Sequence, residues 1–271
     1  MESVVVQDSK QETPVIHVED LTVFRSGKSV IHDVNLKVFK GDFVAIVGPN
    51  GGGKSTLLLS ILGLLRVQKG SIRIFDQPPS SKHVFGKIGW VSQAAAHLSK
   101  DVKITVQELV RLGTVSIHNM FSFLDNGRSE SVQKALQMVG MECCADCNIA
   151  HLSGGQRQRA VIARALASNA ELIILDEPLV GIDRASKNAL LKLLNRLCQE
   201  EGKTIIMVSH DLAAMRQTTH RLVFLEEAIQ FDGKTDSFPD LAGLADLQGL
   251  NDVQSDETQS LMSRIRDKMV E

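Results

Sequence analysis

A glycine-rich loop that ends in a lysine and two hydroxyl residues is the stretch best suited to chemistry. The loop consists of Gly48, Pro49, Asn50, Gly51, Gly52, Gly53, Lys54, Ser55 and Thr56. Its spacing fits the P-loop pattern G-x-x-x-x-G-K-[ST], and it follows an apolar run, Phe43 to Val47, and precedes a helical run. Glycine N–H groups can surround a phosphate because no Cβ is in the way, and the helix N-terminus favours an anion. We therefore expect a bound nucleoside triphosphate, with Lys54 on its β- and γ-phosphates and Ser55 on Mg²⁺.

Two acidic residues end an apolar run later in the chain. Leu172 to Leu175 is typical of a parallel strand buried on both faces, and Asp176 and Glu177 follow it. Taken alone, a solvated turn would explain such a pair better. Beside a P-loop, we expect Asp176 to hold Mg²⁺, directly or through water, and Glu177 to act as the general base on an attacking water.

The elements that must position these residues follow from hydrophobic periodicity. Strands are predicted at residues 15–18, 21–24, 31–39, 71–75, 87–93, 172–177 and 204–208, with a closing hairpin over 222–231. Helices are predicted at residues 56–65, 156–167 and 185–198. The pattern predicts an α/β fold, a P-loop NTPase core with an N-terminal antiparallel β subdomain and an inserted helical subdomain.

The domain organisation follows from changes in composition along the chain. Helical periodicity replaces strand periodicity between Thr105 and Asp146, and the chain turns polar and acidic from Thr235. We expect a polar tail at residues 1–13, an ATPase domain at 14–235 with a helical subdomain at about 94–157, and a polar tail at 236–271. A short helix, Leu261 to Val270, is expected in that tail, more as a frayed amphipathic end than as a partner contact.

Composition excludes several classes of protein. A net charge of −2 over 271 residues gives no reason to expect nucleic acid as a partner. The N-terminus lacks the basic and long apolar regions of a signal peptide, and no apolar run approaches the ~20 residues of a membrane span. We expect a cytoplasmic protein whose membrane role, if it has one, depends on a partner.

Three cysteines lie close together at Cys143, Cys144 and Cys147, with His151 behind them. On a helix, Cys144, Cys147 and His151 would share one face, which suggests a soft-metal site. A second C-x-x-C pair is missing, so reduced cytosolic thiols are the favoured reading.

A second glycine loop opens another helix. Leu152 is followed by Ser153, Gly154, Gly155 and Gln156, and by the same physics this loop is a second anion site. A chain with one P-loop has little use for a second phosphate site of its own, so we expect two copies to face each other, each placing this loop on the other's nucleotide. The combination resembles the ATP-binding cassette (ABC) ATPases, whose signature loop reads LSGGQ, over roughly Val15 to Gly233.

The resemblance assigns roles to further residues. Gln93 is similar to the glutamine that touches Mg²⁺ and the attacking water and links the site to a transmembrane partner. Asp183, in Gly181-Ile182-Asp183, is similar to the residue at the dimer interface, and His210 resembles the histidine that contacts the γ-phosphate and steadies Glu177. The aromatic residue that stacks on adenine in this family falls on Arg25, with Phe24 beside it, so either side chain is a candidate for the base.

Within the family, three stretches resemble the zinc/manganese-type metal importers: Ile104 to Glu108, Gly181 to Asp183, and Phe231 to Gly233. The resemblance implies an ATP-hydrolysing homodimer that drives separate transmembrane permease subunits at the cytoplasmic face of the membrane, with an extracytoplasmic solute-binding protein. Another importer or exporter, or a soluble ABC protein without a permease, stays open as an alternative. A non-catalytic module is disfavoured because Lys54 and Glu177 are intact.

Overall fold

The computed structural model describes residues 13–96, 103–115, 127–216 and 218–238. The chain divides into one unit up to Asp236 and a second from Ser237 onward. The predicted helix from Leu261 to Val270 lies outside the described residues. Within the described part of the chain, no helix is both long and apolar enough to span a membrane.

An antiparallel sheet of three strands forms the N-terminal part, as predicted. Its order is β2-β1-β4, with β1 at Ile16–Arg25, β2 at Lys28–Val38 and β4 at Lys69–Ile74. The two short strands predicted over residues 15–24 are one strand in the structure, because β1 continues through an irregularity at Asp20, whose φ is +45°. Ser26 and Gly27, both at positive φ, make the tight turn from β1 to β2.

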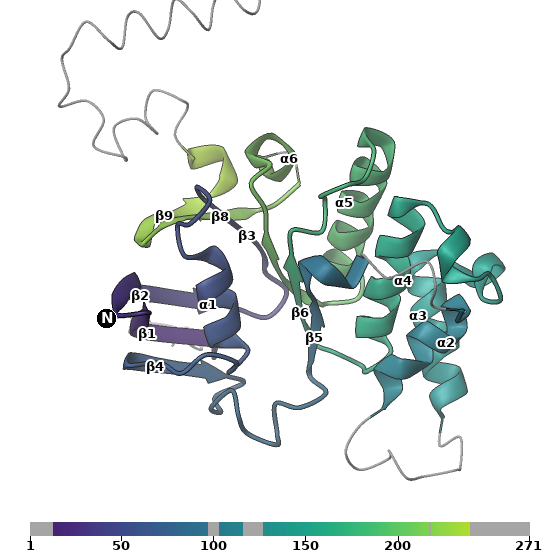
Figure 1. The fold of residues 1–271 in the computed structure, drawn as a ribbon, viewed down its shortest axis with the longest axis horizontal. Coiled ribbons are helices and arrows are strands. Elements are labelled where there is room, and N and C mark those ends of the chain that lie inside the picture. Colours follow the sequence, from purple (N-terminus) through teal and green to yellow (C-terminus); the bar gives the residue numbers. More distant parts are fainter. Residues whose placement is uncertain (1–12, 97–102, 116–126, 217, 239–271) are drawn as a thin grey trace, which may run out of the picture. The chain divides into compact units, whose positions relative to one another are not determined.

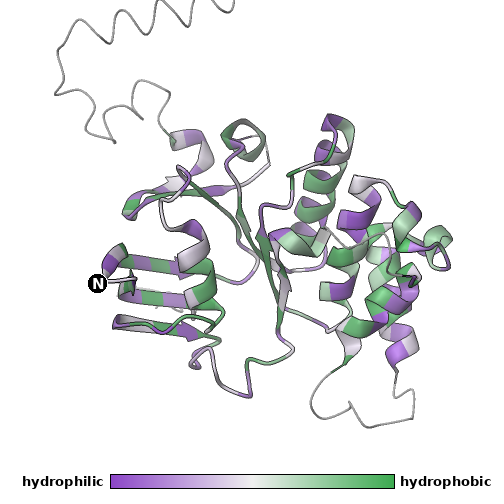
Figure 2. Cartoon of the chain, viewed as in Figure 1, coloured by the Kyte–Doolittle hydropathy of each residue, from purple (hydrophilic) through white to green (hydrophobic). Residues whose placement is uncertain are grey.

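A six-stranded sheet in the order β5-β6-β7-β3-β8-β9 carries the P-loop strand near its centre. All neighbours are parallel except β8 and β9, which are antiparallel. Its strands are β3 (Phe43–Val47), β5 (Ile88–Val91), β6 (Leu172–Asp176), β7 (Thr204–Val208), β8 (Arg221–Glu226) and β9 (Ala228–Lys234). Every residue of β3 and β7 is buried, as expected for parallel strands covered on both faces, and Figure 2 shows these central strands as hydrophobic.

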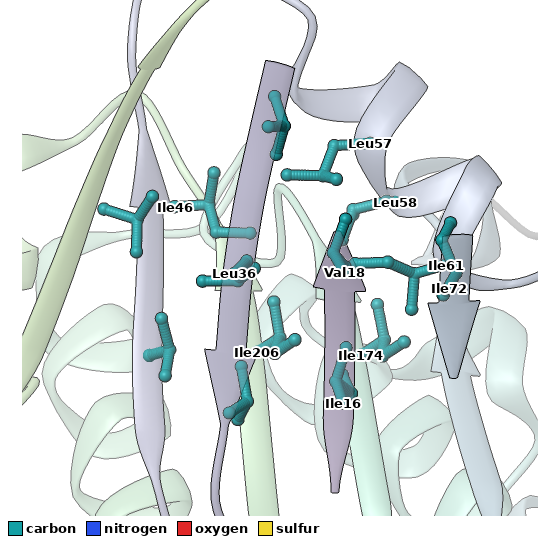
Figure 3. Packing of buried hydrophobic residues seen from close by; sticks show 14 of the residues in the cluster. Ile16, Val18, Leu36, Ile46, Leu57, Leu58, Ile61, Ile72, Ile174 and Ile206 are labelled. Atoms are coloured by element: carbon teal, nitrogen blue, oxygen red, sulfur yellow. The ribbon is translucent and has the colours of Figure 1, made fainter. Parts of the chain in front are cut away.

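Helix α1 (Lys54–Ile61) lies between the two sheets (Figure 1). Its apolar side chains, Leu57, Leu58 and Ile61, meet residues of both sheets in one buried cluster, which Figure 3 shows from close by. Burying each such side chain contributes roughly 1.5–3 kcal/mol, so this cluster fixes α1, and the loop before it, against both sheets. The helix ends earlier than the predicted Leu65 because Gly63 adopts a left-handed φ of +70°.

The remaining helices are α2 (Val106–Arg111), α3 (Arg128–Val139), α4 (Gly154–Leu166), α5 (Arg184–Gln199) and α6 (Leu212–Arg216). The first three lie on the β5 side of the six-stranded sheet, α5 contacts β7, and α6 lies near β8 (Figure 1). Helices α2, α3 and α4 contact one another, and α4 also packs on β5 and α5. Strand β5 is shorter than predicted, because Gln93 begins a turn of 3₁₀ helix, Gln93–Ala96.

Candidate nucleotide site

The P-loop has a shape that only glycine permits at two of its positions. Gly48 and Gly53 have φ of +151° and +94°. A Cβ at Gly48 would lie 2.0 Å from the carbonyl oxygen of Leu225, and one at Gly53 would lie 2.2 Å from Cγ2 of Ile31. The loop is therefore wedged between β8 and β2. Gly53 is also the N-cap of α1 and has no side chain, so the first N–H groups of the helix stay available to an anion.

Lys54 directs its amine back into this loop. The side chain is buried, and Nζ donates to the carbonyl oxygens of Gly48 and Pro49, at 2.8 Å each. Burial lowers the pKa of Lys54, while the charges of Glu177 and Asp176 oppose that shift. The loop carbonyl oxygens thus hold the ammonium group at the P-loop, where a cation favours the binding of phosphate oxygens.

The predicted acids lie at the carboxyl end of β6. Burial and the neighbouring charge of Glu177 raise the pKa of Asp176, and Lys54 opposes the rise. Glu177 stands just beyond the strand at φ +51°, and its N–H donates to the carbonyl oxygen of Val208 on β7 at 3.0 Å. Such a left-handed residue that is not glycine is uncommon and points to a functional constraint.

His210 meets Glu177 across the ends of β6 and β7. Its Nδ1 is 2.9 Å from Oε2 of Glu177. The carboxyl ends of parallel strands are where ligands bind in open α/β sheets, and a histidine bonded to a carboxylate at that edge is suited to orienting it. The structure thus brings together two residues that the resemblance had paired.

Several of these groups, Gly53, Lys54, Glu177 and His210 among them, line one cavity of about 530 Å³. Its lining consists of Arg25, Val30, Asn50, Gly51, Gly53, Lys54, Ser55, Thr56, Gln93, Glu177, Val180 and His210. Phe24 is not in this lining and is 46% exposed on β1. Val30 and Val180 were not predicted as site residues from the sequence. Their only signal is that each lies close in the chain to a predicted site residue.

The cavity has the size and donors that a nucleoside triphosphate with a magnesium ion requires. Ligand pockets are typically ~300–1,000 Å³, and this one combines loop N–H groups with an ammonium. Ser55, Gln93 and Asp176 offer the oxygen ligands that Mg²⁺ prefers. Of these three, Ser55 and Gln93 line the cavity, and Asp176 lies next to Glu177, which does.

The second glycine loop lies elsewhere in the structure. None of the residues 153–156 is among those that line the nucleotide cavity in the described part of the chain. Ser153 and Gln156 form a reciprocal capping box at the start of α4, with Ser153 Oγ accepting from Gln156 N–H at 3.2 Å and Gln156 Oε1 from Ser153 N–H at 2.9 Å. Among the described residues, the two glycine loops therefore do not contribute to the same cavity.

The segment after Glu177 packs against this second loop. A Cβ at Gly155 would lie 2.6 Å from Oγ of Ser186, and one at Gly154 would lie 3.1 Å from Cγ2 of Ile182. Asp183 is the N-cap of α5 and accepts from Ser186 N–H and Oγ. These hydrogen bonds lower the pKa of Asp183.

The cysteine cluster does not form the metal site suggested above. Among the residues with a described position, no three His, Cys, Asp or Glu side chains are placed to hold a metal ion. Sγ of Cys143 and Sγ of Cys144 are 3.8 Å apart, and this contact is the main cause that raises the pKa of Cys144 to about 11. The soft-metal hypothesis for the cluster is wrong.

Comparison with known proteins assigns the family. Residues 31–180, more than half of the chain, match the family model for "ABC transporter". The chain belongs to the ABC transporter family. As an ABC chain with this site, it is an ATP-hydrolysing subunit. ATP is therefore the nucleotide that this chain binds and hydrolyses.

Similar ABC proteins include several named for metal transport. The chain is 37% identical over 224 residues to the zinc uptake system ATP-binding protein of Listeria innocua, covering 83% of this chain and 87% of that protein. It is 37% identical over 216 residues to the manganese transport system ATP-binding protein of Halalkalibacterium halodurans, covering 80% and 84%.

Solved structures confirm the predicted ABC fold. One neighbour, an inward-facing metal-chelate type ABC transporter, has a TM-score of 0.75 and 29% identity, covering 88% of this chain and 89% of that one. Another is a dimeric cassette in a post-hydrolysis state with ADP and phosphate, with a TM-score of 0.66 and 29% identity, covering 82% of this chain and 100% of that chain.

Proposed function

We propose that this chain is the ATPase subunit of an importer of divalent metal ions, zinc or manganese. The observation that carries the proposal is the likeness, over four-fifths of the chain, to proteins named for zinc uptake and manganese transport. The nucleotide-binding chain does not need to touch the cargo, so the metal is identified through the relatives and not through the site.

Several residues in and beside the cavity have a proposed task in hydrolysis. Lys54 and the N–H groups of the P-loop hold the β- and γ-phosphates. Ser55, Gln93 and Asp176 hold Mg²⁺, which would neutralise charge on the phosphate oxygens. Glu177 accepts the proton of the attacking water, and His210 keeps that carboxylate in place through its 2.9 Å hydrogen bond.

For the adenine base, we propose Arg25 in preference to Phe24. Arg25 lines the nucleotide cavity, and Phe24 is its neighbour on a strand whose successive side chains point to opposite faces. A planar guanidinium can stack on a base as an aromatic ring does. Val30, on β2, lines the same cavity and would give the base an apolar contact.

We further propose that two copies close around two ATP molecules. The loop of Ser153, Gly154, Gly155 and Gln156 of one copy would complete the cavity of the other, and Asp183 would lie at the interface. The dimer would drive transmembrane permease subunits at the cytoplasmic face of the membrane, supplied by an extracytoplasmic solute-binding protein. We expect no nucleic-acid partner, in keeping with the net charge of −2.

A Glu177→Gln variant tests the catalytic part of the proposal. It removes the base but keeps the shape and a hydrogen-bonding side chain, so we expect ATP binding and an ATP-dependent dimer with turnover lowered ~10²–10⁴-fold. Dimer formation is measured by size-exclusion chromatography with ATP and Mg²⁺. Hydrolysis at the wild-type rate would exclude Glu177 as the base.

Purification of the tagged chain from detergent-solubilised membranes tests the transport part. We expect a permease to co-purify, and cells lacking the chain to take up less radiolabelled zinc or manganese. Recovery of a permease with unchanged uptake of both metals would point to another importer or an exporter. If the chain hydrolyses ATP but no membrane protein co-purifies with it, the result would favour a soluble role.

A further inference from the structure

An ion pair joins helix α5 to the turn that carries His210. Lys187 lies in the first turn of α5, where its N–H donates to the carbonyl oxygen of the N-cap residue Asp183. Its Nζ donates to Oδ2 of Asp211 at 3.1 Å. Asp211 directly follows His210, so Lys187 is connected to the catalytic histidine by one peptide unit.

The histidine needs such support because little else holds its ring. The side chain of His210 is 61% exposed, whereas that of Glu177 is 13% exposed. Packing fixes a buried side chain in one rotamer but does not fix an exposed one. The 2.9 Å contact of His210 with Glu177 therefore depends on where the backbone of the turn lies.

Asp211 is the residue that shapes this turn. Its Oδ1 accepts from the N–H of Ala214 at 3.1 Å, at the start of α6, and its own N–H donates to Oγ of the buried Ser209 at 3.1 Å. Although burial opposes it, the hydrogen bonds from Ala214 and Lys187 lower the pKa of Asp211. Because Oδ1 of Asp211 binds Ala214, the other carboxylate oxygen, Oδ2, binds Lys187 and fixes the turn against α5.

Space beside the turn would allow it to move without this bond. A cavity of about 200 Å³ is lined by Glu177, by residues 179–182, by Lys187 and by residues 209–211. A turn that faces a cavity can shift at small energetic cost, since few packed atoms oppose the movement. Both partners of the ion pair, Lys187 and Asp211, line this cavity, so their bond joins α5 to the turn at the cavity wall.

We infer that Lys187 is a positioning residue for ATP hydrolysis, which fixes Asp211 against α5 and so keeps His210 in hydrogen-bond contact with Glu177. The inference rests on the proposed roles of Glu177 and His210. A misplacement of 1 Å can cost about 10²-fold in rate, whereas a partly exposed ion pair contributes little to stability. Loss of Lys187 should therefore slow turnover far more than it weakens the fold.

Lys187→Met tests this, with Lys192→Met as the matched control on an exposed lysine of the same helix. We expect Lys187→Met to lower kcat for ATP by about 10- to 100-fold at unchanged KM, with a thermal midpoint equal to that of Lys192→Met. Lys187→Arg, which keeps the charge, should retain most of the activity. Equal kcat values for Lys187→Met and Lys192→Met would overturn the inference.

A double-mutant cycle with Asp211→Asn separates the bond from a general disturbance. The amide keeps an oxygen for Ala214 N–H but loses the charge that Lys187 neutralises. We expect the double variant to be no slower than the slower single variant, because both remove the same contact. Rate losses that multiply would contradict the inference. If His210→Ala hydrolyses ATP at the wild-type rate, both the catalytic role of His210 and the inference about Lys187 are overturned. If His210→Ala is inactive but Lys187→Met is fully active, only the inference about Lys187 is overturned.

Discussion

The P-loop offers a matched pair of glycines in which the cost of an added methyl group differs for one structural reason. Gly51 and Gly53 both lie in the left-handed region, at φ +86° and +94°. A Cβ at Gly51 would meet nothing within 4 Å, whereas one at Gly53 would lie 2.2 Å from Cγ2 of the fully buried Ile31. We predict that Gly53→Ala destabilises the domain more than Gly51→Ala does.

The magnitude follows from two contributions. The left-handed backbone costs an alanine roughly 1–2 kcal/mol at either position. At Gly53, overpacking adds about 1–3 kcal/mol, because Ile31 is held within the core and cannot move away. The expected losses are thus about 2–5 kcal/mol for Gly53→Ala and about 1–2 kcal/mol for Gly51→Ala. The entropy that alanine removes from the unfolded chain is the same in both variants and cancels in the comparison.

Thermal unfolding followed by circular dichroism measures the difference. For a domain of this size, each kcal/mol shifts Tm by about 2–4 °C, so the two variants should differ by about 2–12 °C. The measurement is made without nucleotide, because both glycines line the candidate nucleotide cavity and a bound ligand would add its own stabilisation.

The reasoning fails if Gly51→Ala lowers Tm as much as Gly53→Ala. That result would mean that the contact between Gly53 and Ile31 does not limit the P-loop. The strained backbone alone would then account for both losses.

Two further predictions concern residues that sequence and structure assign together. Ser153→Ala should slow ATP turnover and lower Tm by about 2–4 °C, because it removes an N-cap worth about 1 kcal/mol. The control Ser153→Thr keeps the capping hydroxyl and should keep Tm. Full turnover of Ser153→Ala in a steady-state assay would exclude a role of Ser153 on a partner's nucleotide. Arg25→Ala should raise the Kd for ATP by about 5- to 30-fold, in keeping with the ~1–2 kcal/mol of a stacked guanidinium. The control Phe24→Ala should leave Kd unchanged. A larger rise in Kd for Phe24→Ala than for Arg25→Ala in nucleotide titrations would move the base contact to Phe24.

The sequence predicted the strand and helix order well where the signal is local. The P-loop strand matches the predicted residues, and β7 lies where the apolar run places it, because a buried parallel strand is one continuous hydrophobic segment. Element ends were less accurate: α1 stops at Ile61, because the left-handed Gly63 ends it, and not at Leu65. The soft-metal site failed because it assumed one continuous helix, whereas Glu142–Cys144 and Ile149–His151 form two separate 3₁₀ turns.

By itself, the sequence determined the chemistry that this protein can perform, since the P-loop, the acids after β6 and the second glycine loop are short motifs whose function resides in spacing along the chain. The resemblance to ABC ATPases paired His210 with Glu177, but only the tertiary structure gave the contact, because β6 and β7 bring together residues 33 positions apart. The same holds for Arg25, which strand geometry places at the cavity instead of Phe24. It holds also for Lys187, whose bond to Asp211 depends on how α5 packs beside the sheet.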